Sequence, residues 1–283
     1  MAATLAQLSP APFDGAAPQY DETFTQTNIG RAQRHAVWRR FERTFKSGQR
    51  VLDIGCGTGI DACFLAGRGV RVVACDSSSQ MLAVADRRIA DQRLQKIVHS
   101  VLLPAEAIRS LQTNELFDGA VSNFGALNCF EDTAEFAAGL ATLLKPVARA
   151  SLVWIGPACL WEMIWYVSHG NTRKAFRRFH REGVSANVAG GPPFRVSYPK
   201  IRNLATAFHP EFHLRSIRGI GIAVPPSYME SWAANHLHLM RSFSFADRAL
   251  SRIPGIRVLA DHVLLEFERT ETPPRPASAG SAK

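Results

Sequence analysis

The sequence predicts an α/β fold: a doubly wound, seven-stranded sheet with a helical N-terminal lid and an inserted cap. Short apolar runs alternate strictly with helical patterns between residues 50 and 155, as is typical of a parallel sheet with helices on both faces. A glycine-rich turn joins the first apolar run to the first of these helices. With 283 residues, of which 46% are hydrophobic, the chain can bury one large core.

The individual elements follow from hydrophobic periodicity in chain order. Apolar residues at helical spacing between positions 20 and 45 predict one or two amphipathic helices before the core. Apolar runs then predict strands at residues 50–54, 70–75, 96–102, 117–122 and 150–155. Helical patterns lie between these runs at residues 61–68, 79–92 and 133–144.

The second half of the chain departs from this rhythm. It predicts helices at residues 158–168, 172–181 and 201–208, separated by a Gly- and Pro-rich loop at 183–199. Two further strands, one within 212–224 and one at 262–268, flank a helical insertion at 227–253. We therefore expect this organisation: tails at 1–18 and 271–283, lid helices at 19–49, a cofactor-binding core at 50–157, a cap at 158–210, and the remaining core strands with their insertion at 211–270.

The composition indicates which compartment and which partners to expect. The five cysteines include no C-x-x-C pair, so we expect buried thiols in a reducing cytoplasm and no zinc or other metal site. No secretory signal precedes the core. The apolar stretch 150–168 is nearly long enough to span a bilayer, but Gly156, Pro157 and Glu162 interrupt it. A buried strand followed by a core helix explains this stretch better.

Charge bears on partners more than on fold. The formal net charge is +9, and the basic residues concentrate near positions 31–50 and 173–181. Such runs are usually solvated helix faces, while nucleic acid, anionic lipid or phosphate are the alternative partners. The sequence outside the core adds little to the nucleic-acid alternative, because the last 13 residues contain only Arg275 and Lys283 as basic side chains.

The most informative segment reads VLDIGCGTGIDACFLAGRGVRVVACD, at residues 51–76. Gly55, Gly57 and Gly59 follow a strand and precede a helix, where the backbone must turn sharply and can approach a ligand closely. A dinucleotide-binding fingerprint would need its third glycine at Ile60. Asp53 would also disfavour a pyrophosphate, whereas it suits a cationic ligand. This pattern points away from NAD.

Asp76 ends the second strand about 20 residues beyond the first glycine, the spacing at which a carboxylate accepts both ribose hydroxyls of an adenosine. The site therefore calls for an adenosine without phosphates and with a positive charge, and S-adenosylmethionine fits this description. The alternative is that Asp53 and Asp76 only cap the turns that follow them. Their occurrence together with the glycines favours a ligand site.

The LDIGCGTG run and the order of elements around it resemble the class I S-adenosylmethionine-dependent methyltransferases of small-molecule type, which have a Rossmann-like fold. The resemblance covers about residues 50–155 and the last strand. It implies that Gly55 to Gly59 contact the methionine part of the cofactor, Asp76 the ribose, and Ser77 and Met81 the adenine.

The same resemblance assigns further cofactor contacts. Ala105 and Glu106 correspond to the loop that closes on the adenine edge; Pro104 stands where the family often has an Asp, so the Ala105 backbone would hold the adenine. Asn123, at the end of the fourth strand, would lie below the sulfonium, although Asn is also an ordinary turn residue there. Tyr20, followed by Asp21, resembles a lid tyrosine that covers the cofactor; a plain surface tyrosine is the alternative.

Catalysis and acceptor choice are less well determined by the sequence. His169, His209 and His213 are conceivable general bases, although a lone histidine more often has a structural role. The cap carries aromatic residues next to its basic run: Trp154, Trp161, Trp165, Tyr166, Phe176 and Phe179. This combination suits a lipophilic acceptor with an anionic group, or a membrane surface; an aromatic mini-core with a solvated face is the favoured structural explanation.

Three functions remain open on the sequence. The first is methyl transfer to a small molecule, with no expectation about the oligomeric state. The second is methylation of RNA, which the net charge alone favours. The third is a non-catalytic relative that only binds the cofactor, which would need a damaged motif, and this motif is intact.

Overall fold

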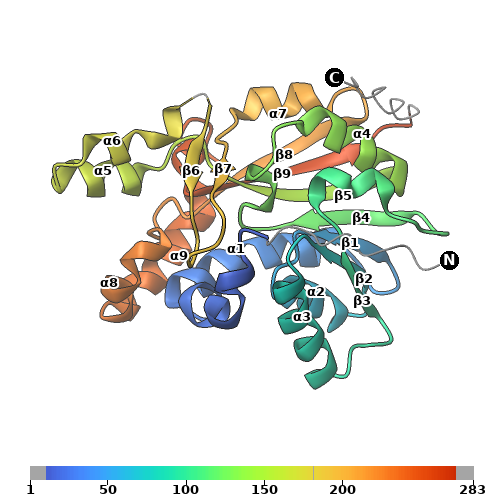
Figure 1. Cartoon of the computed structure of the whole chain (residues 1–283). Helices are drawn as coiled ribbons and strands as arrows, with labels where there is room; N and C mark the ends of the chain where they lie inside the picture. Colours follow the sequence, from blue (N-terminus) through green and yellow to red (C-terminus); the bar gives the residue numbers. More distant parts are fainter. Residues whose placement is uncertain (1–10, 181, 272–283) are drawn as a thin grey trace.

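A seven-stranded sheet with helices on both faces forms the centre of the molecule (Figure 1). The computed structural model describes residues 11–180 and 182–271. The strand order is β3-β2-β1-β4-β5-β9-β8. The strands are β1 Arg50–Ile54, β2 Arg71–Asp76, β3 Val98–Leu102, β4 Phe117–Ser122, β5 Leu144–Ile155, β8 Phe212–Ile220 and β9 His262–Arg269. This architecture confirms the fold class that the sequence predicts.

The strand order reverses between β1 and β4, and this places the ligand site. β1 to β5 run parallel, so their carboxyl ends share one edge of the sheet. β9 is antiparallel to both β5 and β8, and His262 pairs with Ile155 at that same edge. In open α/β sheets ligands bind at the carboxyl edge where the order reverses.

Two hydrophobic clusters, one on each face, hold the helices against the sheet. One face is covered by α1 Asn28–Thr44, α2 Ile60–Ala66 and α3 Ser79–Asp91, and the other by η3 Ala105–Ser110, α4 Thr133–Leu143 and α7 Ile201–Phe208. Side-chain oxygens of Thr27, Ser78 and Asp132 accept backbone amides at the starts of α1, α3 and α4. Such caps fix where these helices begin.

The cap lies beyond the carboxyl edge of the parallel strands, on the left of Figure 1. It contains α5 Leu160–Ser168, α6 Thr172–Ala175, η5 Arg177–Phe179 and the hairpin β6 Val184–Ala186 and β7 Phe194–Val196. After β8 the chain adds η6 Ser227–Met229, α8 Glu230–Ala234, α9 Leu237–Leu250 and η7 Arg257–Leu259. η4 Ala126–Asn128 follows β4 at the same edge.

Three sequence expectations about these elements are wrong. The helix expected at 172–181 is broken into α6 and η5, and the loop expected at 183–199 contains the β6–β7 hairpin. Trp154 does not belong to the cap: it lies in β5, is 1% exposed, and packs edge-on against Phe208 and Phe267. Strand alternation directs its ring into the core, which the aromatic composition of the neighbouring cap does not reveal.

The N-terminal segment is ordered further toward the start of the chain than expected. Residues 14–18 were assigned to a tail, but they belong to η1 Asp14–Gln19, which is followed by η2 Asp21–Thr25. Small residues allow close packing there: a Cβ on Gly15 would lie 2.7 Å from the carbonyl oxygen of Ala189 in the hairpin loop. The ring centroids of Phe13 and Phe194 are 5.3 Å apart. The remaining tail residues, 1–10 and 272–283, lie outside the described part.

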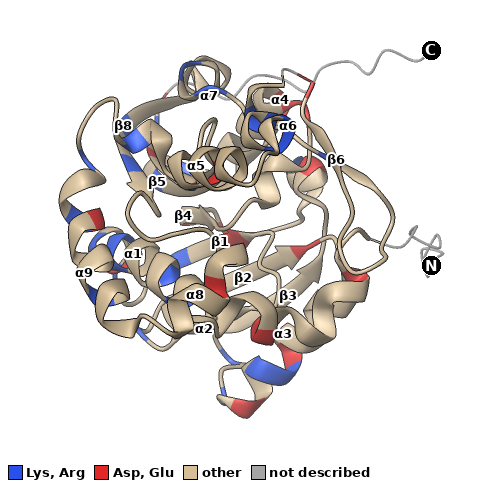
Figure 2. Cartoon of the chain, turned by 90° about the vertical axis from the view of Figure 1, so that its left-hand side faces the viewer, with Lys and Arg blue, Asp and Glu red and all other residues tan. Residues whose placement is uncertain are grey.

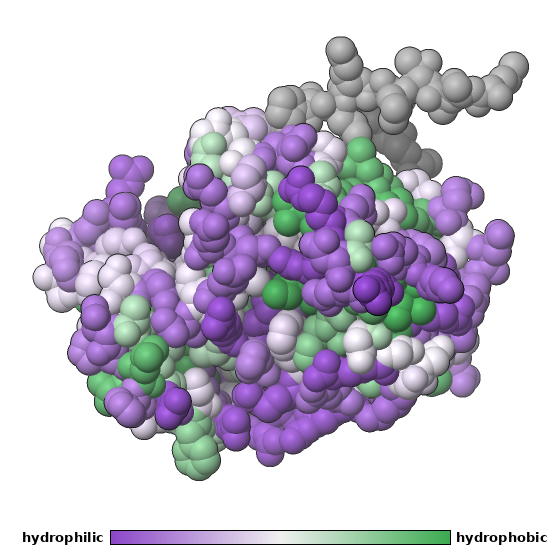
Figure 3. Space-filling model, turned by 90° about the horizontal axis from the view of Figure 1, so that it is seen from below, coloured by the Kyte–Doolittle hydropathy of each residue, from purple (hydrophilic) through white to green (hydrophobic). Residues whose placement is uncertain are grey.

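The surface shows no continuous apolar band on the face seen from below, where hydrophobic patches alternate with hydrophilic residues (Figure 3). Within the described residues, no helix is both long and apolar enough to cross a membrane. The stretch 150–168 is divided between β5 and α5. Exposed hydrophobic side chains nevertheless lie on the cap elements and on α9. In the cap they are Leu160, Ile164, Val167, Phe176 and Phe179, and on α9 they are Leu237, Leu239 and Phe245.

Candidate functional site

The glycine-rich turn after β1 leaves an open space above its backbone. Gly55, Gly57 and Gly59 all have positive φ, at 66°, 55° and 73°, a region that L side chains rarely adopt. A Cβ on Gly55 would lie 2.2 Å from the Cβ of Ala126, whereas a Cβ on Gly57 would meet nothing within 4 Å. The turn is therefore closed toward η4 and open at Gly57, where a ligand can approach the backbone.

Asp76 lies at the end of β2 beside this turn. Its Oδ2 accepts the backbone amide of Gly57 at 2.8 Å, and its Oδ1 accepts that of Ser78 at 2.9 Å. Burial raises the pKa of this carboxyl above its usual value, while the backbone hydrogen bonds oppose the shift. A carboxylate held in this way retains further lone pairs for a ligand's hydroxyl groups.

Asp53 and Asp61 form an acidic pair beneath the turn. The Oδ2 of Asp53 is buried without a hydrogen-bond partner among the described residues. Burial, and then the charge of Asp61, raise the pKa of Asp53 well above its usual range. This is the environment in which a positive ligand charge stabilises a carboxylate. The residues therefore fit S-adenosylmethionine. The backbone at Gly57 is open to a ligand, the Asp76 carboxylate can accept hydrogen bonds from ribose hydroxyls, and the buried Asp53 carboxyl can face the positive sulfur.

Asp61 itself organises the side of the site next to α1, a role that the sequence analysis missed. It forms a buried ion pair with Arg34 and accepts hydrogen bonds from Trp38 Nε1 at 2.5 Å and Asn123 Nδ2 at 3.2 Å. Asn123 is thus at the expected strand end, but its amide is directed to Asp61. The guanidinium of Arg34 also lies 4.7 Å from the ring centroid of Phe124.

The backbone after β4 is strained at this point. Phe124 has φ of 50°, which is unusual for a bulky residue and is found where a site constrains the chain. Its ring contacts those of Phe24, at 5.1 Å, and His262, at 5.2 Å. The strained residue thereby connects the N-terminal segment with the start of β9.

The N-terminal segment is fixed over the glycine-rich turn by two carboxylates. Asp21 accepts a hydrogen bond from the Thr58 hydroxyl at 2.8 Å and forms an ion pair with Arg88. Asp14 accepts a hydrogen bond from the Ser78 hydroxyl at 2.5 Å. Tyr20 stands between these two acids; burial, and the charges of nearby acids, raise its pKa to about 12, against the opposing effect of Arg34. This location agrees with a lid position for Tyr20.

The residues expected near the adenine lie around the ends of β2 and β3. Met81 is 2% exposed on α3. Ser77 and Glu106 are exposed, and Ala105 begins η3. The amide of Leu103 donates to the carbonyl of Asp76 at 2.9 Å, which holds these two strand ends together. None of the four side chains makes a contact that assigns it to a ligand, so these cofactor contacts stay predictions.

The three histidines considered as bases are not at the centre of this site. His213 pairs with Glu268 near the start of β8, so it lies at the opposite edge of the sheet from the carboxyl ends. His209 ends α7 just before that strand. His169 follows α5, is exposed, and its Nδ1 lies 2.8 Å from the carbonyl of Trp165. Because β9 is antiparallel to both β5 and β8, β8 runs in the same direction as β1 to β5, and its start lies at the edge opposite their carboxyl ends. This strand direction, which local periodicity does not determine, excludes His209 and His213.

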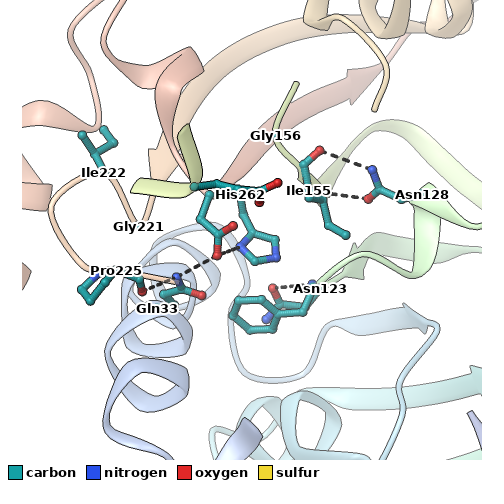
Figure 4. A network of polar contacts seen from close by, with 12 residues as sticks. Gln33, Asn123, Asn128, Ile155, Gly156, Gly221, Ile222, Pro225 and His262 are labelled. Carbon is teal, nitrogen blue, oxygen red and sulfur yellow. Dashed lines mark hydrogen bonds and ion pairs between the residues drawn. The ribbon is translucent and has the colours of Figure 1, made fainter. Parts of the chain in front are cut away.

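His262, at the start of β9, is the histidine that the fold brings to the site. Figure 4 shows its imidazole near Gln33 and Asn123. Its Nδ1 is 3.3 Å from Asp261 Oδ2, and Gln33 Nε2 donates to the same oxygen at 3.1 Å. Nε2 has no hydrogen-bond partner among the described residues. Only the preceding Asp261 could have signalled this residue in the sequence.

Asp261 is held by the cap as well as by Gln33. Its Oδ1 lies 2.7 Å from Arg178 Nη2, and the nearby charges of His262 and Arg178 lower the pKa of Asp261 strongly despite its burial. Arg177 and Arg178 both pair with the buried Glu162 on α5. Two members of the expected basic run therefore stabilise the cap from within. Among the members of that run that the structure describes, Arg173 and Lys174 are exposed.

An aromatic cluster lies where the cap and the helices after β8 pack against α1. Trp161, Trp165, Trp232 and Phe243 pack against a buried group that includes Ile29. The ring of Trp165 also lies 6.4 Å from that of Tyr228. Phe176 and Phe179, in contrast, stack on each other at the surface. The cap aromatics thus form both a mini-core and an apolar wall next to the site.

Comparisons with known proteins agree with this geometry. Residues 51–147 match the family model described as "Methyltransferase domain". A demethylmenaquinone methyltransferase of Clavibacter sepedonicus is 33% identical over 139 residues, which are 49% of this chain and 54% of that protein. The chain therefore spans about half the length of the curated relatives it matches. The family model covers the glycine-rich turn.

Solved structures resemble the chain over most of its length. The CcbJ methyltransferase of Streptomyces caelestis gives a TM-score of 0.60 at 16% identity, covering 92% of this chain and 98% of that one. The [4+2]-cyclase SpnF gives 0.60 at 14% identity, covering 93% and 97%. Identities this low show the shared fold only, and the second protein is named for a different reaction.

Proposed function

We propose that this chain, a class I S-adenosylmethionine-dependent methyltransferase, transfers a methyl group to a hydrophobic small molecule. The observation that carries the proposal is the open space at Gly57, beside a carboxylate for ribose hydroxyls at Asp76 and a buried acid with an unpartnered oxygen at Asp53. The methyltransferase match over residues 51–147 supports it. When bound, the cofactor supplies an electrophilic methyl group on a positively charged sulfur.

The residues of this chain then have to align the nucleophile and exclude water. Asp76 holds the ribose and the backbone at Gly57 faces the methionine part. Asp53 offsets the positive charge. Tyr20 and its neighbours close over the cleft, fixed by the Asp21–Arg88 ion pair.

His262 accepts the proton of the acceptor in this proposal. Its Nε2 lies at the carboxyl edge beside Phe124, while Asp261 faces Nδ1 from the other side of the ring. The carboxylate of Asp261 lies 3.3 Å from Nδ1, on the side of the ring where an orienting acid lies in a base–acid pair. No other described histidine meets the site at this edge of the sheet.

The acceptor is a ring-containing, apolar molecule in this proposal, because tryptophan and phenylalanine rings pack against the start of α1, the helix whose Arg34 pairs with Asp61. The relatives named for demethylmenaquinone are consistent with such an acceptor, although the match omits most of the cap. The exposed apolar residues on α5 and α9 further suggest a transient contact with a membrane surface from the cytoplasmic side.

Calorimetry tests the cofactor assignment. We expect S-adenosylmethionine and its demethylated product to bind with one-to-one stoichiometry, and NAD not to bind. Binding of NAD without adenosylmethionine would overturn the proposal.

A radiolabelled methyl group tests the acceptor class. We expect transfer to a demethylated naphthoquinol in detergent and none to total RNA. Labelling of RNA alone would establish the nucleic-acid alternative. Cofactor binding with no transfer to a panel of hydrophobic phenols and quinols would favour a non-catalytic relative.

A further inference from the structure

A cavity of about 180 Å³ lies at the outer edge of the sheet, and no residue assigned to the cofactor or the acceptor lines it. Its walls come from the second half of α1, the end of β8, and the last turn of α9 with the residues after it. Six arginines surround it, here called the arginine cavity: Arg39, Arg40, Arg43, Arg218, Arg248 and Arg252. Figure 2 shows basic residues on α1, α9 and β8 on the same side of the molecule.

Most of these arginines have no acidic partner. Within residues 11–180 and 182–271, only Arg40 among the six forms an ion pair, with Glu266 at 2.7 Å. The Nε of Arg218 is buried there without a hydrogen-bond partner. Asp247 lines the cavity too, but its carboxylate accepts three successive backbone amides of the segment after β8, at 3.1, 3.0 and 2.5 Å. Both nearby carboxylates are therefore engaged.

The rest of the chain cannot supply another acidic side chain. Residues 1–10, 181 and 272–283 contain no Asp or Glu. Glu42 also acts on Arg39 through its charge, but its carboxylate is paired with Arg68 at 2.6 Å. Neutralisation of the arginine cavity by this chain therefore depends on carboxylates that are already engaged.

The arginines also repel one another. Burial lowers the pKa of Arg39, and the charges of Arg248 and Arg43 lower it further. Burial also lowers the pKa of Arg218, and the charges of Arg40 and Arg252 lower it further. A guanidinium nevertheless stays protonated in proteins, so deprotonation cannot relieve the repulsion. An anion from solution can.

We propose that the arginine cavity binds the phosphate or diphosphate group of a small anion. The planar guanidinium group matches phosphate oxygens with two parallel hydrogen bonds, which favours phosphate over a monovalent ion. The cavity has the volume of about six water molecules in the liquid, which holds such a group and leaves the rest of a larger ligand in solvent. A free anion, a phosphate ester and a lipid headgroup share this chemistry.

The first experiment titrates inorganic pyrophosphate into the full-length wild-type protein at constant ionic strength. We expect saturable, one-to-one binding. Arg218→Gln should weaken it at least about tenfold, the scale of a lost charge-assisted hydrogen bond. Arg202→Gln, which changes an exposed arginine on α7, is the matched control and should bind as wild type does. Absence of saturable binding, or equal binding by Arg218→Gln, would overturn the proposal.

A second variant keeps the test informative if Arg218→Gln does not fold. Arg252 is exposed, and Arg252→Gln should raise the melting temperature in phosphate-free, low-salt buffer because it removes repulsion. Pyrophosphate should then raise the melting temperature of this variant less than that of wild type. The proposal would be contradicted if Arg252→Gln melted at a lower temperature than wild type and if pyrophosphate raised its melting temperature as much as that of wild type.

Two further arms identify the source of the phosphate. Phosphatidylglycerol vesicles that displace pyrophosphate from wild type, but do not bind Arg218→Gln, would assign the site to a lipid headgroup. Failure of the vesicles to compete would assign it to a soluble anion. Tight binding of an RNA oligonucleotide that requires Arg218, with no binding of pyrophosphate, would overturn the small-anion proposal. Binding of S-adenosylmethionine should be equal in all variants, so this result is independent of the proposed methyl transfer.

Discussion

Two carboxyl groups in the cofactor cleft differ in how their charges are compensated. Both oxygens of Asp76 accept backbone amides, whereas one oxygen of Asp53 has no partner among the described residues. The first arrangement fixes a carboxylate for hydroxyl recognition. The second retains an uncompensated acid that a cationic ligand would stabilise.

Replacement of Asp76 by Ala should weaken S-adenosylmethionine binding by about 1–3 kcal/mol, because hydrogen bonds to a charged acceptor are lost. Calorimetry measures this change, and circular dichroism checks the fold. Asp91→Ala, at an exposed position at the end of α3, is the matched control. Wild-type affinity in a folded Asp76→Ala protein would show that the ribose assignment is wrong.

Replacement of Asp53 by Asn should alter how stability depends on pH. Burial raises the pKa of Asp53 in the folded state above the value of about 3.9 expected when unfolded. Its favourable contribution is therefore complete below the unfolded pKa and is lost as pH rises through the folded pKa. The free energy of unfolding of Asp53→Asn, minus that of wild type, should increase from pH 4 upward. Urea titrations without cofactor measure it; a difference independent of pH would contradict this account.

Replacement of His262 by Gln should lower kcat about 10²- to 10⁴-fold if it is the base, with S-adenosylmethionine affinity unchanged. The ascending limb of the wild-type pH–rate profile should disappear. His238→Gln, at an exposed position on α9, should keep wild-type rates. A His262→Gln enzyme with the wild-type pH profile would restrict this residue to packing against Phe124.

At the scale of elements, one charged cluster attaches the cap to the sheet. Glu162 on α5 accepts Arg177 and Arg178 from η5, and Arg178 also binds Asp261 before β9. α5 and η5 are neighbours in the sequence, whereas Asp261 is 83 residues from Arg178. Because Glu162 and Arg178 are 1% and 6% exposed, removal of one charge leaves another buried without compensation.

Replacement of Glu162 by Gln should therefore lower the free energy of unfolding by about 3 kcal/mol. Denaturant titration measures the loss, and hydrogen exchange should show it first in α5 and η5. Glu131→Gln is the control, because Glu131 is 81% exposed and lies 3.9 Å from Arg195; exposed pairs contribute less than about 1 kcal/mol. Equal effects of the two substitutions would contradict the role of this cluster.

At the scale of the whole molecule, the net charge of +9 is distributed in ways that total charge does not reveal. Arg177 and Arg178 form ion pairs with Glu162 inside the cap, and Arg34 forms a buried ion pair with Asp61. Five arginines without an ion pair among the described residues lie together around the arginine cavity, beside α1 and α9. The charge thus favours a compact anion over an extended polyanion.

Binding of wild-type protein to single-stranded RNA should accordingly be weak. The logarithm of the association constant should fall with the logarithm of salt concentration with a slope magnitude below about 2, which corresponds to fewer than about three neutralised phosphates at roughly 0.7 each. Fluorescence anisotropy at several salt concentrations measures this slope. A steeper slope, together with methyl incorporation into RNA, would instead indicate a nucleic-acid methyltransferase.

The sequence alone determined the order of strands and helices between residues 50 and 155, the glycine-rich turn and the position of Asp76 at a strand end. These features depend on local periodicity and on short spacings that survive in any fold of this class. Its resemblance to a known family also predicts that Tyr20 covers the cofactor, and this stays a prediction.

The tertiary structure decided which distant residues meet at the site. His262 faces Phe124 because β9 inserts antiparallel between β5 and β8, and the same insertion leaves His209 and His213 at the opposite edge. The arginine cavity likewise needs α1, β8 and α9 together. Pairing between distant strands depends on the whole core, whereas periodicity reports only which face of each element is buried.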